Sequence, residues 1–497
     1  MSYFLGIDIG TFESKGVITD EAGKVVASAA RPHKMLVPQP GWAEHRPKQD
    51  WWGDFRFLSG KLLAESRIDP KAIKAVGASA IGPCMLPVDR EGEALSNAAL
   101  YGVDGRAVAE IEELTARIGA ERILDRCGNA LTTQSVGPKI LWLKKNRPAL
   151  YDAAAKIVTS TTYIVQKLTG ECVVDHYSAA SFSPLYEIGA QGWSNALADD
   201  IVELDRLPRV LWTADIAGWV TRKAARETGL AAGTPVIAGT IDAASEAFSV
   251  GVMKPGDMMV MYGSTIFIIM LSSQRIQDGR LWYAPWLFPG EHASMSGLAT
   301  SGTLTHWFRD QFARELPFET AFATLTQEAL KSPPGAKGLV MLPYLSGERT
   351  PIHNPRAKGV IFGLNLTHGR GDLYRAVVEG IAFGTNHVLE TYREIGEPPK
   401  RLLAVGGGTR NSVWLQATSD ISGMPQTLRE RTFGASYGDA FLAALAIGAV
   451  KKGDIGAWNP TARKVAPRRG NRAVYDRQYG IFKAIYARTR DLMEELS

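Results

Sequence analysis

Two short strand–turn–strand segments, one at the start of the chain and one near its middle, constrain the possible folds more than any other feature. Residues 4–20 place a turn containing Gly10 and Thr11 between two strands, and residues 258–271 repeat this arrangement around Gly263-Ser264-Thr265. A structural unit that recurs along a chain is typical of a duplicated architecture. We interpret the second segment as a diverged internal repeat of the first, which predicts two similar domains.

The rest of the pattern predicts an α/β fold with domains at residues 1–245 and 246–497. Short apolar runs alternate with longer helical patterns, and helices are expected over residues 139–146, 319–330 and 372–395. The chain has 497 residues, of which 45% are hydrophobic and 22% are charged. That length suits about two to four globular domains, and the composition excludes a disordered or fibrous class.

Composition also limits the partners. The net charge of +5 is spread over the whole chain, which is too weak an excess to predict binding of nucleic acid. The apolar run at residues 266–271 is far shorter than a membrane span, so no membrane partner is expected. The N-terminus shows no signal-peptide pattern, and the three cysteines form no CxxC pair. These features disfavour a disulfide scaffold or a zinc site and favour a reducing, cytoplasmic location.

The turn at Gly10 has the composition of a phosphate-binding site. A glycine after a strand lets backbone N–H groups approach an anion, Thr11 adds a hydroxyl group, and Lys15 offers a positive charge. Asp8 is the kind of hard oxygen ligand that Mg²⁺ prefers. The same residues also suit an ordinary hairpin turn with a capping aspartate, and the spacing leaves that alternative open.

Two further glycine turns extend this interpretation. Gly263-Ser264-Thr265 is a second candidate phosphate turn, although taken alone it is more simply a connection between two strands. Gly406-Gly407-Gly408 leaves room for a flat ring or a ribose, or else serves only as a turn that needs positive φ. Phosphate turns at matching places in two half-chains predict a nucleoside triphosphate held in the cleft between them.

Asp242 follows a buried strand at the expected start of a helix. An aspartate in that place is commonly the helix N-cap, and the spacing alone favours this role over that of a general base. Three other chemistries are unsupported because their motifs are missing. The chain has no Walker A loop, no HExxH zinc motif, and no GxGxxG after its first strand.

Taken in order, the motifs resemble those of the FGGY carbohydrate kinases, a branch of the actin/hexokinase/Hsp70 superfamily. The resemblance runs over nearly the whole chain and rests on Leu5–Thr11, Gly41–Glu44, Trp51-Trp52, Pro138–Leu143, Leu168–Gly170 with Asp175 and Ser178, Pro343–Pro351, and Gly359–Glu379. Among these, Pro343–Pro351 reads PYLSGERTP, which is nearly identical to a signature of the family.

The resemblance implies two actin-like (ribonuclease H-like) domains around a cleft, and transfer of a phosphoryl group from ATP, with Mg²⁺, to a sugar or polyol hydroxyl. It makes Asp242 the catalytic base, which reverses the preference for a cap, and assigns Asp8 to Mg²⁺. The other implied positions are nucleotide contacts at Gly10, Thr11, Lys15, Gly263, Ser264, Thr265, Gly302, Thr303, Gly406, Gly407 and Asn411, and sugar contacts at Asp104 and Arg106. The oligomeric state cannot be read from the sequence, but the resemblance is compatible with a homodimer, since many relatives are dimers.

The acceptor is less constrained. The overall resemblance to xylulose kinases predicts D-xylulose, but Gly82-Pro83 stands where those enzymes carry Met-His and glycerol kinases carry Arg-Glu. Tyr101-Gly102 also departs from the tryptophan of the family's W-x-D-x-R segment. Because specificity depends on hydrogen bonds to hydroxyls, another pentulose, a substituted xylulose or a tetritol such as erythritol stays open. A non-catalytic sugar sensor is the alternative of a different class, which the presence of Asp8 and Asp242 disfavours.

Overall fold

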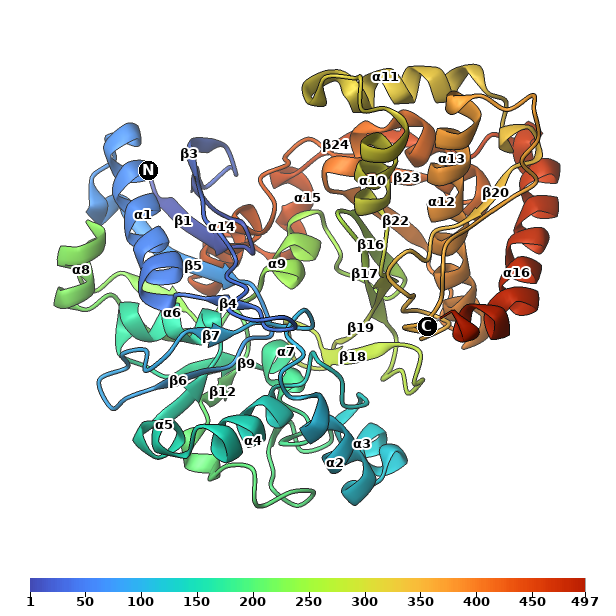
Figure 1. Ribbon diagram of the computed structural model, residues 1–497. Helices are drawn as coiled ribbons and strands as arrows, with labels where there is room; N and C mark the ends of the chain where they lie inside the picture. The colour runs from blue at the N-terminus through green and yellow to red at the C-terminus, as the bar shows by residue number, and fades with distance from the viewer. Residues whose placement is uncertain (497) are drawn as a thin grey trace.

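The structure, a computed structural model, describes residues 1–496 and forms two lobes (Figure 1). Within those residues each lobe is built on a mixed sheet of seven strands. The first sheet contains β1 (Tyr3–Ile9), β2 (Glu13–Asp20), β3 (Val25–Pro32), β5 (Ile73–Ala80), β13 (Ile216–Trp219), β14 (Pro235–Ile237) and β15 (Thr240–Ile241). The second contains β16 (Asp257–Tyr262), β17 (Ile266–Ser272), β18 (Trp282–Pro285), β19 (His292–Leu298), β22 (Arg401–Val405), β23 (Gln426–Arg429) and β24 (Thr461–Val465).

The two sheets share one topology, which confirms the predicted internal repeat. In the first sheet β3, β2 and β1 are antiparallel neighbours, and β5 and β14 continue from β1 in parallel. In the second sheet β19, β17 and β16 are antiparallel neighbours, and β22 and β23 continue from β16 in parallel. This shared order is that of the actin-like, ribonuclease H-like fold expected from the sequence.

Helices cover the outer face of each sheet and bury its apolar side chains. The helices on the first sheet are α1 (Gly53–Ser66), α6 (Ser160–Thr169) and α8 (Arg222–Thr228). Those on the second are α10 (Gly302–Phe312), α11 (Phe318–Lys331), α12 (Arg370–Glu394), α13 (Ser412–Ser422) and α16 (Arg472–Glu495). The helices predicted over 319–330 and 372–395 are therefore α11 and α12, and the one over 139–146 is the end of α4 (Val136–Asn146).

The inner faces of the two sheets are joined by α9 (Asp242–Ser249) and α14 (Ala435–Ala446), which share one apolar core with both sheets. Although α14 comes late in the chain, it packs on β1 and β5, and Figure 1 shows it beside the blue strands. Glycines permit this close approach, since a Cβ on Gly6 would lie 1.9 Å from the backbone oxygen of Ser436. The boundary predicted at residue 245 falls inside α9, and α14 and α15 (Ile455–Trp458) return to the first lobe.

A helical extension with its own small core lies below the first lobe (Figure 1). It contains α2 (Val108–Ile118), α3 (Ala120–Cys127), α4 and α5 (Pro148–Ala153). The remaining short elements are β4 (Glu44–His45), β6 (Leu86–Val88), β7 (Ala98–Ala99), β8 (Lys156–Val158), β9 (Val173–Asp175), α7 (His176–Ala179), β10 (Tyr186–Glu187), β11 (Gly192–Trp193), β12 (Arg209–Leu211), β20 (Val340–Leu342) and β21 (Val360–Phe362). Of the helices in residues 1–496, none has the length and apolar character that a membrane span needs.

Candidate active site

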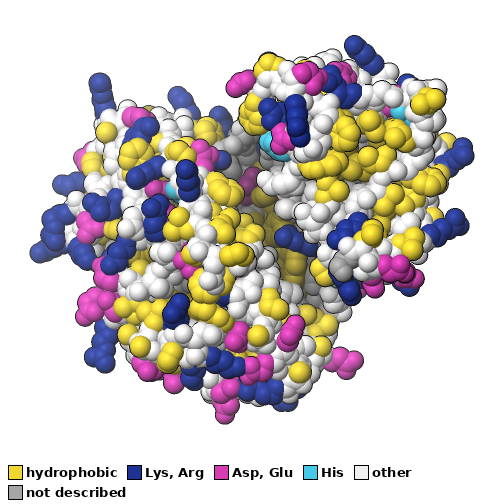
Figure 2. Space-filling view, viewed as in Figure 1, with side chains coloured by type: hydrophobic (Ala, Val, Ile, Leu, Met, Phe, Trp, Pro, Cys, Tyr) yellow, Lys and Arg dark blue, Asp and Glu magenta, His cyan; other side chains and the backbone are white. Residues whose placement is uncertain are grey.

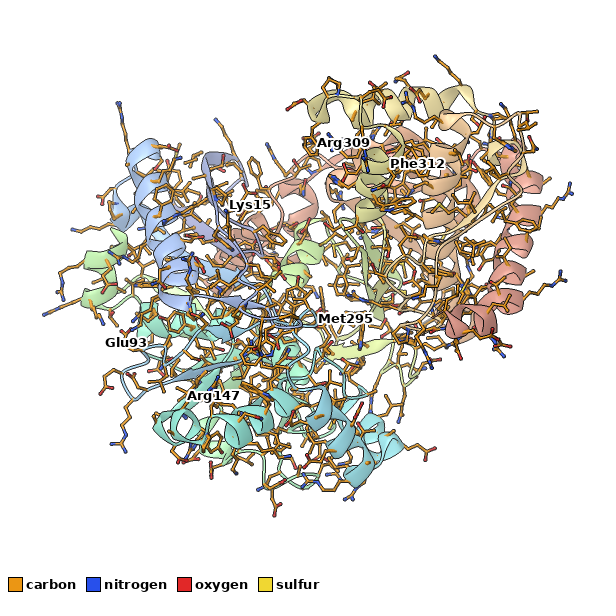
Figure 3. All side chains as sticks on the ribbon, in the orientation of Figure 1. Lys15, Glu93, Arg147, Met295, Arg309 and Phe312 are labelled. Carbon is orange, nitrogen blue, oxygen red and sulfur yellow. The ribbon has the colours of Figure 1, made fainter. Side chains whose placement is uncertain are left out.

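A cavity of about 330 Å³ lies between the lobes, at the bottom of the groove seen in Figure 2. Asp8, Thr11 and Asp242 line it from the first lobe, and Thr265 and Met295 line it from the second. Figure 3 shows Lys15 on the side of the first lobe that faces the groove. Both predicted phosphate turns and the predicted base therefore border one space.

Asp242 stands at the start of α9, but it is not the cap of that helix. The N-cap position is Ile241, and among residues 1–496 the Asp242 carboxylate accepts a hydrogen bond only from the adjacent Ala243 N–H, at 2.7 Å. A capping side chain would instead accept from the N–H group two or three residues farther on. The capping role favoured by spacing is therefore wrong, and the carboxylate is available to the cavity.

Burial controls the acid–base chemistry of this site. It raises the pKa of Asp242 to about 7, with the Ala243 N–H opposing and the charge of Glu246 adding to the shift. Burial likewise raises the pKa of Asp8 well above its usual value, and the charges of Asp242 and Asp439 add to it. Glu246 was missed in the sequence, although its place one helical turn after Asp242 puts it on the same face of α9. The cavity thus holds acids that repel one another and that a cation would stabilise.

A further acid that the sequence analysis did not identify, Asp439, is linked to Asp8 through Ser79. Asp439 on α14 is fully buried, and its oxygens lie 2.7 Å from Ser79 Oγ and 2.7 Å from Ser245 Oγ. Ser79 Oγ is also 3.1 Å from Asp8 Oδ1. Burial raises the pKa of Asp439 to about 8. Asp439 therefore connects α14 to α9 through Ser245, and to β5 and Asp8 on β1 through Ser79.

The first predicted phosphate turn presents free donors. The Gly10 N–H closes the turn onto the Glu13 carbonyl at 3.1 Å, whereas the N–H groups of Thr11 and Phe12 have no acceptor among residues 1–496. Lys15 is half exposed and lies 3.3 Å from Glu13. Burial raises the pKa of Glu246, and the charge of Lys15 opposes that rise. The turn thus offers an anion two backbone donors, with the cationic side chain of Lys15 on the next strand.

The second turn is built in the same way. Its Ser264 and Thr265 N–H groups lack acceptors within the described chain, while its carbonyl groups accept from the start of α10. Gly302 N–H donates to the Gly263 oxygen at 3.0 Å, and Thr303 N–H donates to the Ser264 oxygen at 3.1 Å. Gly302 and Thr303 therefore support the turn through their backbones.

The third glycine turn lies beside the second. Gly406 has φ +91°, and a Cβ there would lie 2.7 Å from the Tyr262 oxygen, whereas a Cβ on Gly407 would meet nothing within 4 Å. Asn411 is the N-cap of α13, where its side chain accepts from the N–H groups of Val413 and Trp414 at 3.1 Å. Its oxygen is thus committed to the helix, while Gly407 leaves open space for a nucleoside.

Asp104 and Arg106, the predicted sugar contacts, are not among the residues that line the cavity. Arg106 lies 2.7 Å from Asp104 and 2.9 Å from Glu44, and its guanidinium stacks 3.9 Å from the ring centre of Trp42. The side chains of Arg106 and Asp104 are 5% and 0% exposed, respectively. Their hydrogen-bonding groups therefore join neighbouring segments of the first lobe, and their contact with a sugar stays a prediction.

The cavity lining includes residues from several other segments of the chain. Gly82 and Pro83 line the cavity, so the two positions that bring no side-chain hydrogen-bond donor are part of its wall. Tyr101, Gln134, Tyr177 and Arg349 also line it. Of these, Arg349 belongs to the PYLSGERTP segment and Tyr101 to the altered W-x-D-x-R segment, so both lay within recognisable motifs.

Comparisons with known proteins agree with this geometry. Residues 3–249 match the N-terminal domain, and residues 258–447 the C-terminal domain, of the FGGY family of carbohydrate kinases. The chain is 28% identical to a xylulose kinase of Bacillus subtilis, over 99% of this chain and 98% of that one. It is 26% identical to a gluconokinase of the same species, over 99% and 96% of the two chains. A xylulose kinase structure from Rhodospirillum rubrum superimposes with a TM-score of 0.92 at 33% identity, covering 99% of this chain and all of that one.

Proposed function

Because the chain belongs to the FGGY family of carbohydrate kinases, we propose that it transfers the γ-phosphoryl group of ATP to a hydroxyl of a small sugar, with Asp242 as the base. The observation that carries this proposal is the position of Asp242. Its carboxylate, which does not cap α9, lines the same cavity as Thr11 and Thr265, and each of these threonines belongs to one phosphate turn. Nucleotide phosphates gripped by both turns would bring the γ-phosphate to the acceptor.

In this mechanism Asp242 accepts the proton of the acceptor hydroxyl. The freed oxygen forms a bond to the γ-phosphorus, and the bond from that phosphorus to the β–γ bridging oxygen breaks, releasing ADP. The N–H groups of Thr11, Phe12, Ser264 and Thr265 would hold phosphate oxygens. Since water is the competing acceptor, closure of the lobes over both substrates is expected.

The acids of the cavity fit a magnesium ion that arrives with the nucleotide. Mg²⁺ is usually held by one or two carboxylates together with phosphate oxygens and water. Asp8 is the carboxylate next to the first turn, and burial together with the charges of Asp242 and Asp439 raises its pKa. Among residues 1–496 no group of three potential ligands forms a metal site by itself. When bound, Mg²⁺ would neutralise charge on the phosphate oxygens.

The pH dependence of catalysis tests the role of Asp242. A base whose pKa is raised to about 7 is protonated in acid, so kcat/KM for the acceptor should fall about tenfold per unit as the pH drops below that value. Glu246→Gln removes a neighbouring negative charge and should move this fall to lower pH. Activity that stays level from about pH 8 to pH 5 would exclude Asp242 as the base.

For the acceptor, D-xylulose is the leading candidate. The similarity to xylulose kinases supports it, and the cavity offers hydrogen-bonding groups on Tyr101, Gln134 and Tyr177. Another pentulose, a substituted xylulose or a tetritol such as erythritol is compatible with Gly82 and Pro83, which bring no side-chain donor. An aldonic acid is a second candidate, because Arg349 is the one cationic side chain in the lining formed by residues 1–496, and a guanidinium can bind a carboxylate.

ADP release measured in a coupled assay distinguishes these acceptors. We expect stimulation by a pentulose to exceed stimulation by tetritols, glycerol and aldonic acids. Stimulation by an aldonic acid alone, lost in Arg349→Gln, would replace the pentulose with the second candidate. If no acceptor stimulates ADP release although ATP binds, the chain is a sensor and the kinase proposal fails.

A further inference from the structure

The carbonyl groups of the first phosphate turn all accept hydrogen bonds from residues that do not line the cavity. His33 Nε2 lies 3.0 Å from the Gly10 oxygen, and His45 Nε2 lies 3.0 Å from the Thr11 oxygen. The backbone N–H of His33 also donates to the Phe12 oxygen at 2.9 Å. The rings of His33 and His45 pack edge to face, 4.9 Å apart. Two histidines thus brace three consecutive peptide groups.

The geometry of the peptide bond links these hydrogen bonds to phosphate binding. In a trans peptide the carbonyl and the following N–H point in opposite directions. Fixing the Gly10 and Thr11 carbonyls against the histidines therefore turns the Thr11 and Phe12 N–H groups away from them. These are the two N–H groups without an acceptor in the described chain.

In the second lobe, backbone donors instead of histidine side chains hold the carbonyl groups of the turn. There the carbonyls of Gly263 and Ser264 are held by the backbone N–H groups of Gly302 and Thr303. In the first lobe, β3 is followed by the segments that carry His33 and His45, and α1 begins only at Gly53. Histidine side chains supply the donors that the main chain supplies in the repeat.

The hydrogen bonds specify the protonation of each ring. His45 Nδ1 lies 3.0 Å from Trp51 Nε1, which can only donate, so His45 is neutral with its proton on Nε2. Burial and the charge of His33 lower the pKa of His45 to about 4. His33 instead faces acceptors on both sides, with Asp54 Oδ2 at 2.8 Å and the Gly10 oxygen at 3.0 Å. Both of its nitrogens must donate, which requires an imidazolium.

The groups around His33 support that charge. Asp54 on α1 is 2% exposed, lies 3.2 Å from Arg31 on β3, and accepts from Ser14 Oγ on β2 at 2.7 Å. Asp50, which is paired with Arg46, adds a weaker negative charge, and the remaining neighbour His45 is neutral. Burial opposes protonation of His33, but the hydrogen bond and charge of Asp54 outweigh it and raise the pKa of His33.

We infer that His33 and His45 are positioning residues that hold the first turn in its phosphate-binding orientation, with His33 as an imidazolium maintained by Asp54. The inference rests on the proposed function, because it presupposes that this turn binds nucleotide phosphate. A raised pKa means that the brace is complete below that pKa and is lost as the pH rises through it. Nucleotide affinity should then weaken in alkali for a reason other than the chemical step.

Calorimetric titration with MgATP across neutral and alkaline pH tests the brace. His33→Phe keeps a ring but no donor, and should weaken binding about 10- to 100-fold near neutral pH. His33→Gln retains one donor and should recover most of the affinity while losing the alkaline decline. Asp54→Asn should move that decline to lower pH. His387→Phe, a half-buried histidine on α12 in the other lobe, is the control and should bind as the unaltered chain does.

The outcomes separate the inference from the function. If the unaltered chain binds no ATP, the proposed function fails and the brace with it. If it binds ATP but His33→Phe binds equally well, only the brace is wrong. Nitrogen NMR of the unaltered protein provides a test that needs no variant: both ring nitrogens of His33 should carry protons at neutral pH, and a neutral ring would overturn the inference.

Discussion

Replacing Asp242 by asparagine is expected to lower kcat by about 10²–10⁴-fold while leaving ATP binding intact. Asparagine has nearly the same shape and can still accept from the Ala243 N–H, as the native carboxylate does. It cannot take the acceptor's proton at any pH. Folding should not suffer, because the substitution removes one of several neighbouring acids whose pKa values are raised by burial and by mutual repulsion.

The measurement pairs sugar-dependent ADP release with calorimetric titration of MgATP. Asp199→Asn is a suitable control, since Asp199 is exposed and lies outside the cavity lining, and its kcat should be unchanged. Retention of more than about a tenth of the original kcat in Asp242→Asn would show that another group accepts the proton.

Gly6→Ala is expected to destabilise the protein by more than about 1–3 kcal/mol, the usual cost of overpacking a core. The new Cβ would lie 1.9 Å from the Ser436 oxygen and 2.5 Å from the Ala440 nitrogen. Both atoms belong to the backbone of α14, so the clash can be relieved only by moving the helix or β1. Such a movement would also disturb Asp439 on the same helix and, through Ser79, the carboxylate of Asp8.

Thermal unfolding measures this effect, with Gly60→Ala as the matched control. Gly60 is exposed within α1, and a Cβ there would meet nothing within 4 Å. The control should be neutral or should stabilise the helix by about 0.5–1 kcal/mol. If Gly6→Ala unfolds at the temperature of the unaltered chain, α14 does not pack on β1 as described.

The sequence predicts features whose signal is local. Both strand–turn–strand units and the glycine turns follow from short runs of residues, and α12 follows from its apolar periodicity. The internal repeat was detectable because each turn keeps small polar residues between apolar strands. Asp242 was placed correctly at a helix start, although spacing alone suggested a cap, because its exact offset from the N-cap depends on backbone angles that the residue types do not encode.

Features that depend on distant parts of the chain were not predictable. The return of α14 to the first lobe brings Asp439 to Ser79, 360 positions away. The pairing of Arg106 with Glu44 and its stacking on Trp42 are also contacts between separate segments, which the spacing of the W-x-D-x-R segment does not encode. Likewise, the braces on Gly10 and Thr11 come from histidines that no phosphate motif contains.

A crystal structure with a non-hydrolysable ATP analogue, Mg²⁺ and a pentulose tests the central claim most directly. The account predicts triphosphate oxygens on the N–H groups of both turns, and an acceptor hydroxyl within about 3 Å of the Asp242 carboxylate. A triphosphate bound to only one lobe, or a sugar whose hydroxyls all lie beyond hydrogen-bonding reach of Asp242, would contradict it.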